Sequence, residues 1–209
     1  MTATQAYSSD VAFTPAVKAI QSAKGSRRSY ARMEEGGSWQ TRVTPDLAHF
    51  VALQTSVFLG TANGEGQPYI QHRGGPAGFL RVVDETTLGF VDFAGNRQFI
   101  TSGNLTDNPR AFLFLIDYMH RKRVKIWGRA RIVEATDELL ATLMPEGYRA
   151  RPEQVILFDI AAWDANCPQH IPQRFEAADV AAALAKRDER IAALEAEIAQ
   201  LKAAQRSAV

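Results

Sequence analysis

The sequence predicts a mainly β protein of the α+β class, built as an antiparallel barrel or sandwich with flanking helices. Six to seven short extended runs follow Ser56, and most are joined in pairs by short turns. Few helical patterns lie between these runs, which argues against a parallel sheet. We therefore expect an N-terminal helical segment at 1–55 that packs on the barrel, a barrel at 56–175, and a C-terminal amphipathic helix at 176–209.

Two helices are predicted before the barrel, and both begin with the pair Thr-Pro. Thr14 is suited to cap a helix that has Pro15 at its first position and Gly25 as its stop. Thr44 and Pro45 repeat this start ahead of an apolar helical face. The first 55 residues are therefore expected to be mainly helical.

The extended runs of the barrel form hairpins separated by turn residues. In order, they are SVFLGTA and QPYIQHR, FLRVV and TLGFVDF, RAFLFLID and KRVKIWGRARIVE, and a last strand, VILFDIAAW. A short helix, ATDELLATL, precedes the last strand. The continuous apolar run AFLFLI predicts burial on both faces, with one face available to a partner subunit.

The C-terminal segment carries a heptad repeat. Its a and d positions are Ala177, Val180, Leu184, Ile191, Leu194, Ile198 and Leu201, and only Arg187 interrupts them. Ile at a with Leu at d favours a two-stranded parallel coiled coil, in which Arg190 meets Glu195 and Glu197 meets Lys202 of the partner. The alternative is an amphipathic helix that lies on its own domain.

Composition limits the function classes. The chain has 209 residues, a net charge of +1 and one cysteine, Cys167. It lacks the charge excess typical of a nucleic-acid or membrane-surface protein, a signal-type start and an apolar run long enough to span a membrane. We expect a soluble, cytoplasmic protein without a metal site. Cys167 is either a small buried apolar residue or a redox-active thiol.

A cluster of polar side chains lies between two predicted core strands, in AGNRQFITSGN. Asn96 is suited to cap a helix beginning at Arg97, and a helix N-terminus favours an anion. The Arg97 guanidinium matches phosphate. Neutral hydrogen-bonding groups follow at Gln98, Thr101, Ser102 and Asn104. The cluster therefore predicts an anion site, although an arginine near a helix start is also common as an ordinary surface residue.

Two further sets of side chains lie at the ends of neighbouring strands. The first set is Gln71, His72 and Arg73, with Arg81 on the next strand. The second set, Arg121, Arg123, Lys125 and Trp127, is expected to share one strand face. A basic face ending in an aromatic ring suits a phosphorylated planar ligand. The alternative is a solvated edge that prevents strand aggregation.

The stretch GQPYIQHRGGPAGFLRVVDETTLGFVDFAGNRQFITSGNLTDNPRAFLFLIDYMHRKRVKIWGRARIVE resembles the pyridoxamine 5'-phosphate oxidase-like FMN-binding family, in its oxidase-related branch. The resemblance covers about 56–175. It implies a six-stranded antiparallel split barrel that works as a homodimer, with FMN at the subunit interface. One subunit would hold the phosphate, and the other would contribute part of the isoalloxazine contact.

The resemblance also implies roles for individual residues. Arg97 matches the phosphate-binding arginine, and Gln98 stands where the oxidase itself has lysine. Arg73 and Arg81 are candidates to replace that charge. Candidate flavin contacts are Arg123, Lys125, Trp127 and Trp163. With Gln71, His72, Asn96 and Ser102, these residues complete the predicted cofactor site.

The end of the barrel departs from the oxidase. AAWDANCPQHIPQRF stands where the oxidase has tryptophan followed by an Arg-Leu-Arg element, so the chain is not interpreted as the vitamin B6 enzyme. We expect an FMN-dependent oxidoreductase with an unidentified small substrate and a nicotinamide as candidate electron donor. His72 and His170 are candidate proton carriers.

Two alternatives remain at this stage. One is a non-catalytic flavin or haem binder, with His72, His120 or His170 as the axial ligand. The other is a dimeric scaffold whose cleft has lost its ligand.

Overall fold

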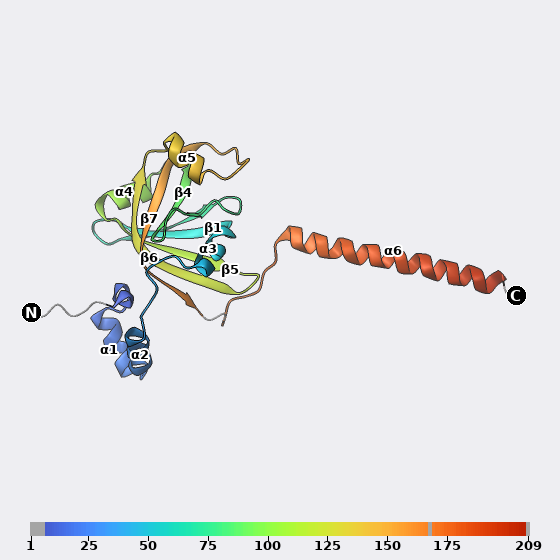
Figure 1. Cartoon of the computed structure of the whole chain (residues 1–209), viewed down its shortest axis with the longest axis horizontal. Coiled ribbons are helices and arrows are strands. Elements are labelled where there is room, and N and C mark those ends of the chain that lie inside the picture. The colour runs from blue at the N-terminus through green and yellow to red at the C-terminus, as the bar shows by residue number, and fades with distance from the viewer. Residues whose placement is uncertain (1–6, 167–168, 208–209) are drawn as a thin grey trace, which may run out of the picture. The chain divides into compact units, whose positions relative to one another are not determined.

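The computed structural model of the chain describes residues 7–166 and 169–207. It contains two compact units (Figure 1). The first comprises Met1–Asp117 and Lys122–Gln169, and holds the sheet and all helices but the last. The second comprises Tyr118–Arg121 and His170–Val209, and holds the long C-terminal helix.

The first unit is built around a seven-stranded antiparallel sheet with the order β2-β1-β5-β6-β7-β4-β3. The strands are β1 Ser56–Ala62, β2 Pro68–Gly74, β3 Arg81–Val82, β4 Thr87–Phe93, β5 Arg110–Asp117, β6 Lys122–Val133 and β7 Pro152–Asn166. All three predicted hairpins are present, and the antiparallel split-barrel class is confirmed. The sheet has one strand more than the resemblance implies, because the two-residue β3 pairs with β4 at one edge.

Apolar side chains on one face of the sheet make the core. Along β1 and β5, buried residues alternate with half-buried ones, as expected where only one face is fully covered. In the single chain Phe112 and Phe114 are half-buried, so the burial of AFLFLI on both faces, with one face against a partner subunit, stays a prediction. Buried core residues from several strands include Val57, Leu59, Leu88, Phe90, Leu113, Leu115, Ile126, Ile156 and Phe158.

A β-bulge interrupts the ladder between β6 and β7 at Trp127 and Gly128. A bulge bends a strand and changes the direction in which its side chains point. Gly128 is required there, because a Cβ would overlap the carbonyl oxygen of Asp159. The bulge lies directly beside Trp127, one of the residues predicted to contact a cofactor.

The helices of the first unit are α1 Pro15–Ala23, α2 Arg27–Glu35, α3 Pro45–Ala52, α4 Ile100–Asp107 and α5 Asp137–Leu143, preceded by the 3-10 helix η1 Ser8–Val11. Both predicted Thr-Pro starts are confirmed. Thr14 Oγ1 accepts a hydrogen bond from Val17 N at 3.3 Å, and Thr44 Oγ1 accepts one from Leu47 N at 3.2 Å.

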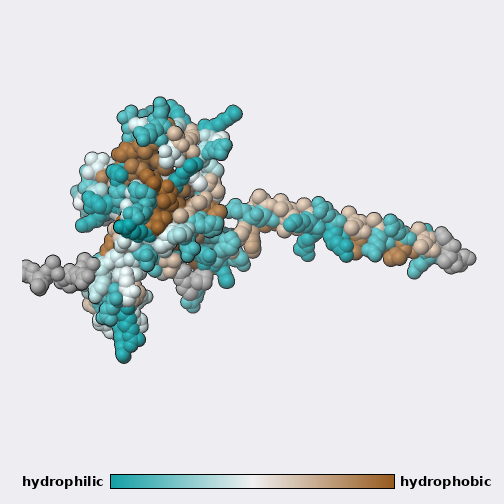
Figure 2. All heavy atoms as spheres, in the orientation of Figure 1, coloured by the Kyte–Doolittle hydropathy of each residue, from teal (hydrophilic) through white to brown (hydrophobic). Residues whose placement is uncertain are grey.

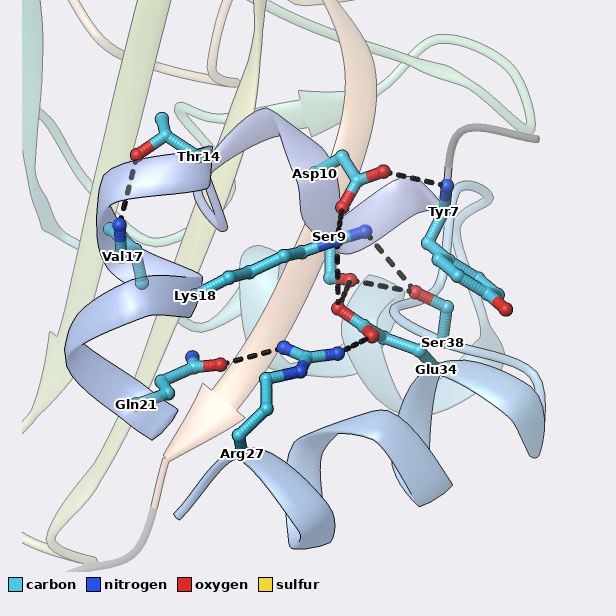
Figure 3. Close-up of polar contacts among 10 residues, drawn as sticks. All are labelled: Tyr7, Ser9, Asp10, Thr14, Val17, Lys18, Gln21, Arg27, Glu34 and Ser38. Carbon is cyan, nitrogen blue, oxygen red and sulfur yellow. Dashed lines mark hydrogen bonds and ion pairs between the residues drawn. The ribbon is translucent and has the colours of Figure 1, made fainter. Parts of the chain in front are cut away.

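A buried carboxylate joins the first three helical elements (Figure 3). The Glu34 side chain on α2 is 2% exposed and forms an ion pair with Arg27. Ser9 Oγ in η1 donates a hydrogen bond to Glu34 Oε1 at 3.4 Å, and Lys18 Nζ on α1 lies 3.6 Å from the same oxygen. Because a buried charge is costly unless paired, these contacts hold η1, α1 and α2 together.

The segment after α2 is joined to β7 through Trp163. Trp163 N donates to the Gln40 carbonyl oxygen, and its indole Nε1 donates to the Arg42 carbonyl oxygen, both at 2.8 Å. These bonds bring Trp39 and the N-terminal helices to the side of the sheet that carries β6 and β7.

The second unit contains α6, a single helix over Ala177–Ser207. Ahead of it, the Arg174 guanidinium lies 4.5 Å from the centroid of the Tyr118 ring. Gln173 Nε2 also donates to the Met119 carbonyl oxygen at 2.9 Å. The domain boundaries at 55/56 and 175/176 stay a prediction.

Candidate functional site

The loop between β4 and α4 has an unusual backbone. Arg97 and Phe99 both lie in the left-handed region, with φ of 59° and 54°. Such conformations are uncommon for residues other than glycine and concentrate at functional sites. Asn96 Oδ1 accepts a hydrogen bond from Gln98 N at 3.2 Å, which closes a local turn.

The prediction that Asn96 caps a helix beginning at Arg97 is wrong. Helix α4 begins at Ile100, its N-cap is Phe99, and no side chain caps it. The two left-handed residues interrupt the helical path, so that Asn96 closes the turn instead. The first N–H groups of α4 therefore lack a side-chain cap at the end that lines the cavity described below.

Arg73 on β2 lies at the centre of a polar network. It forms an ion pair with Asp92 on β4 and donates from its second terminal nitrogen to Thr101 Oγ1 at 3.2 Å. Thr101 Oγ1 in turn donates to Gln71 Oε1 at 2.9 Å. The side chains of Arg73 and Asp92 are 14% and 8% exposed, so the pair is largely shielded from water.

Gln154 on β7 completes the network. Its Nε2 donates to Asp92 Oδ2 at 2.9 Å and to Ser102 Oγ at 3.1 Å. Strands β2, β4 and β7 and helix α4 are thus tied together by side chains at one site. Among the side-chain nitrogen and oxygen atoms of the described residues, the Nε of Arg73 is buried without a hydrogen-bond partner.

A cavity of about 210 Å³ is formed by this network and the strained loop. Its lining residues are Tyr69, Gln71, Arg73, Asp92, Phe93, Gly95, Asn96, Arg97, Gln98, Phe99, Ile100, Thr101, Ser102, Glu153 and Gln154. We call it the polar cavity. Six of the predicted cofactor residues meet here: Gln71, Arg73, Asn96, Arg97, Gln98 and Ser102.

The donor groups of the polar cavity suit an anion. The Arg97 side chain is 66% exposed, and its Nε lies a loose 3.7 Å from Glu153 Oε1, so its terminal nitrogens can turn toward a ligand. The uncapped start of α4 adds backbone N–H groups and the positive end of a helix dipole. Together with the unpartnered Nε of Arg73, these groups fit a phosphate.

Two carboxylates reduce the positive charge of the cavity. Asp92 neutralises Arg73 at close range, and Glu153 lies beside Arg97. Neither residue is among the predicted cofactor residues. Asp92 was detectable in principle, because it is a charged residue inside the otherwise apolar run TLGFVDF. Glu153 and Gln154 carry no such signal, because only the pairing of β7 with β4 brings them to the loop.

A second cavity, of about 530 Å³, lies between the N-terminal helices and β6 and β7. Three predicted flavin contacts line it: Lys125, Trp127 and Trp163. The other lining residues are Ala12, Phe13, Val17, Tyr30, Met33, Ser38, Trp39, Gln40, Asp164 and Ala165. We call it the aromatic cavity. The contribution of the N-terminal segment was not foreseen from the sequence.

Stacked rings dominate the aromatic cavity. Trp39 and Trp127 are nearly parallel, with ring centroids 4.6 Å apart and an angle of 14° between their planes. Lys125 Nζ lies 5.3 Å from the Trp127 centroid and 3.2 Å from Asp164 Oδ2. The site therefore offers a flat apolar surface with a paired charge at its edge, which suits a planar ring.

The remaining predicted residues lie outside both cavities. His72 Nε2 is 2.7 Å from Ser56 Oγ on an exposed part of the sheet. Arg81 donates to the carbonyl oxygens of Gly78 and Met144. Arg123 shares a strand face with Lys125 and Trp127 and pairs in register with Asn166.

Other residues named from the sequence also lie elsewhere. His170, with φ of 64°, belongs to the second unit. Arg121 lies in the turn before β6 and does not share that strand's face. Asn104 Nδ2 donates to Thr61 Oγ1 in the core at 3.0 Å. Cys167 lies outside the described residues. Which of these residues contact a cofactor stays a prediction.

Within the described residues, no helix is long and apolar enough to cross a membrane. The same part of the chain holds no group of three or more His, Cys, Asp or Glu side chains arranged to bind a metal ion.

Comparison with models of known protein families identifies the family to which this chain belongs. The model of the family described as pyridoxamine 5'-phosphate oxidase matches residues 43–167, which is more than half of the 209 residues. The chain belongs to the pyridoxamine 5'-phosphate oxidase family. The match includes both the polar cavity and the β6–β7 side of the aromatic cavity. The N-terminal helices α1 and α2 lie outside it.

Solved structures with similar folds are more distant. HupZ from Group A Streptococcus has 16% identity and a TM-score of 0.49, covering 64% of this chain and 99% of that one. An FMN-binding protein from Syntrophomonas wolfei has 10% identity and a TM-score of 0.46, covering 70% and 97%.

A pyridoxamine 5'-phosphate oxidase-related, FMN-binding protein from Nostoc punctiforme has 13% identity and a TM-score of 0.42, covering 59% and 84%. With TM-scores below 0.5, these likenesses establish nothing further about this chain. No curated protein matches it.

Proposed function

We propose that this protein is an FMN-dependent oxidoreductase that works as a homodimer on a small planar substrate. The observation that carries the proposal is the polar cavity, where a strained loop, an uncapped helix start and a largely exposed arginine converge in a member of this family. Oxidation of pyridoxamine phosphate is not part of the proposal, because the end of the barrel departs from the oxidase sequence.

In the polar cavity, Arg97 and the first N–H groups of α4 hold the FMN phosphate. Ser102, Gln98 and Gln71 add neutral hydrogen bonds around it. Arg73 is held in place by Asp92 and Thr101, so its guanidinium is fixed before any ligand arrives. Preorganised donors of this kind reduce the conformational cost of binding.

The planar part of the cofactor requires a different surface. Arg123, Lys125 and Trp127 share one face of β6, and Trp163 lies on the neighbouring strand. In the proposed dimer, this face of one copy contacts the ring system whose phosphate is held by the other copy. The half-buried Phe112 and Phe114 on β5 are available for the contact between copies.

When bound, FMN supplies hydride or electron transfer, so the protein needs no nucleophile of its own. The chain's residues bind and orient the reactants and exclude water. No catalytic residue is assigned, since His72 lies outside both cavities and His170 belongs to the second unit.

The residues that line the two cavities also bear on haem as an alternative ligand. Haem needs an axial side chain, for which histidine is a common donor. Among the described residues, neither the polar nor the aromatic cavity is lined by a histidine. The donor set therefore favours a phosphorylated flavin over haem.

An absorption spectrum of freshly purified protein tests the proposal, followed by equilibrium titration of FMN-free protein with FMN. We expect flavin bands and saturable binding, and then bleaching by NADH or NADPH under anaerobic conditions. A Soret band would support the haem alternative. Colourless protein that does not bind added FMN would overturn the proposal.

A further inference from the structure

The helix α6 exposes a series of large apolar side chains at heptad spacing, interrupted only at Arg187. Figure 2 shows apolar and polar patches alternating along its visible face. The exposed fractions are 44% for Val180, 52% for Leu184, 53% for Ile191, 38% for Leu194, 49% for Ile198 and 59% for Leu201. Six large apolar residues at a and d positions of one helix are far more than scattered surface residues explain.

The charged residues that flank this stripe are complementary in one arrangement. In a parallel, in-register pair, a g position faces the e position of the next heptad on the other helix. This places Arg190 opposite Glu195 and Glu197 opposite Lys202, on both sides of the pair. All four contacts are attractive.

The antiparallel alternative is less favourable. The register that pairs Ile191 with Leu194 brings e positions together, which places Asp188 beside Glu195, and g positions together, which places Arg190 beside Glu197. It therefore has two repulsive and two attractive contacts, against four attractive contacts in the parallel pair. Parallel packing also matches the order of branched side chains, since Ile191 and Ile198 occupy a positions and Leu194 and Leu201 occupy d positions.

We propose that two copies of this chain associate through α6 as a parallel, in-register, two-stranded coiled coil. The occupant of the exposed stripe is thus the same stripe on a second copy. The inference does not depend on flavin binding. Arg187 lies at a d position and lowers the stability of the coil, while its long stem covers apolar surface and its head reaches the Asp188 carboxylate of the second copy.

Disulfide trapping in the full chain tests the arrangement. In a Cys167→Ser background, Gln205→Cys places a thiol at an a position beyond the apolar layers, and Gln200→Cys places one at an outward c position as the matched control. We expect the Gln205→Cys dimer to form roughly ten times faster, because only seam positions bring two Cβ atoms within disulfide distance. Equal rates for the two variants would overturn the proposal.

A mixed experiment distinguishes the direction of the helices. An antiparallel pair brings position 205 close to position 180, so Gln205→Cys mixed with Val180→Cys would then cross-link to each other in preference to themselves. Preferential formation of that mixed product would overturn the parallel arrangement. Preferential formation of Gln205→Cys homodimers supports it.

Charge reversal gives a second readout without changing the apolar layers. Glu195→Lys faces Arg190 in both halves of the coil and should slow trapping through Gln205→Cys by about fivefold, from the usual size of surface ion pairs. Adding Arg190→Glu restores opposite charges and should restore the rate. An unchanged rate in Glu195→Lys contradicts the proposal.

Failure of this inference and failure of the proposed function are separable. If the protein is yellow and binds FMN but Gln205→Cys and Gln200→Cys cross-link at equal rates, only the coiled-coil proposal is wrong. If the Gln205→Cys dimer forms rapidly in protein that does not bind FMN, only the proposed function is wrong.

Discussion

At the scale of single residues, the polar cavity depends on how two arginines are paired. Arg73 is largely shielded from water and paired with Asp92, whereas Arg97 is mostly exposed and only loosely paired with Glu153. A guanidinium held by an ion pair keeps its position without a ligand, whereas an exposed arginine side chain can rotate to contact one. The two arginines should therefore respond differently to substitution.

Arg97→Ala should weaken FMN binding by about 1.5–3 kcal/mol, the usual range for hydrogen bonds to charged groups. The free energy of unfolding should change little, because the side chain is 66% exposed. Fluorescence titration with FMN measures the affinity. Arg129→Ala serves as the control, since Arg129 is an exposed arginine on β6 that lines neither cavity. Equal affinities of the two variants would exclude the proposed role.

Asp92→Asn should strengthen FMN binding, whereas Arg97→Ala should weaken it. Removing one partner of a buried pair leaves Arg73 uncompensated and should lower the free energy of unfolding by about 3 kcal/mol. FMN should then stabilise the variant more than the wild type, because the freed charge faces the phosphate. Urea unfolding with and without FMN measures both effects. A smaller FMN-induced stabilisation than in the wild type would contradict this account.

At the scale of the elements, substitutions at Gly128 and Gly103 test how closely the backbone near the two cavities is packed. Gly128→Ala should destabilise the protein by about 3 kcal/mol, since the Cβ would lie 2.5 Å from Phe158 Cε1 and overlap the Asp159 carbonyl oxygen. It should also move Trp127 and reduce its contact with Trp39, which tryptophan fluorescence reports.

Gly103→Ala is the matched control for the preceding substitution. Gly103 lies inside α4, and a Cβ there would meet no atom within 4 Å. Alanine is the better helix former, so the free energy of unfolding should rise by about 0.5–1 kcal/mol. Loss of stability in this variant would mean that the α4 backbone differs from the one described.

The N-terminal helices should lose a contact when the solution is made acidic. The hydrogen bond from Lys18 Nζ holds the pKa of Asp10 below its ordinary value of 3.8, against a smaller effect of burial. A lowered pKa means that this contact stabilises the fold above pH 3.8 and is lost as pH falls through the folded value. The same hydrogen bond raises the pKa of Lys18 above 10.5, so stability is also lost as pH rises beyond that value.

Urea unfolding of the wild type and Asp10→Asn at pH 7 and at pH 3 measures this effect. We expect Asp10→Asn to be less stable by no more than about 1 kcal/mol at pH 7, because the pair is partly exposed. The difference should shrink at pH 3, because below pH 3.8 the Asp10 carboxyl of the unfolded chain binds a proton more readily than that of the folded chain. A difference that is constant with pH would exclude this ion pair as its source.

At the scale of the whole molecule, the polar and aromatic cavities are separate within one chain. In the proposed dimer, each flavin would use the polar cavity of one copy and the β6 face of the other. Ligand binding and association are then linked, since FMN would bind the dimer better than the monomer.

FMN should therefore strengthen self-association. Sedimentation velocity at low protein concentration should show more dimer with FMN than without it. The measurement uses the wild-type chain, without the Gln205→Cys cross-link. The Arg97→Ala variant, which binds FMN poorly, should show a smaller shift. Identical sedimentation with and without saturating FMN would place the cofactor within a single chain.

The amino-acid sequence by itself determined the local features of this protein. Thr14 and Thr44 cap helices because a cap needs only its own backbone neighbours, and the hairpins follow from alternation and turn residues. The heptad pattern fixed which side chains of α6 share one stripe. The sequence also named six of the residues that line the polar cavity, although β2 and β4 are not neighbours in the sheet and only the folded chain brings them together.

Only the tertiary structure decided which charges meet and which surfaces are covered. Arg73 pairs with Asp92, Glu153 lies beside Arg97, and Trp39 stacks on Trp127, although these partners are distant in the sequence. The start of α4 was also misplaced from the sequence, because left-handed backbone at Arg97 and Phe99 is set by the surrounding packing. Local propensity acts over a few residues, whereas strand pairing and burial act between segments that meet only in the folded chain.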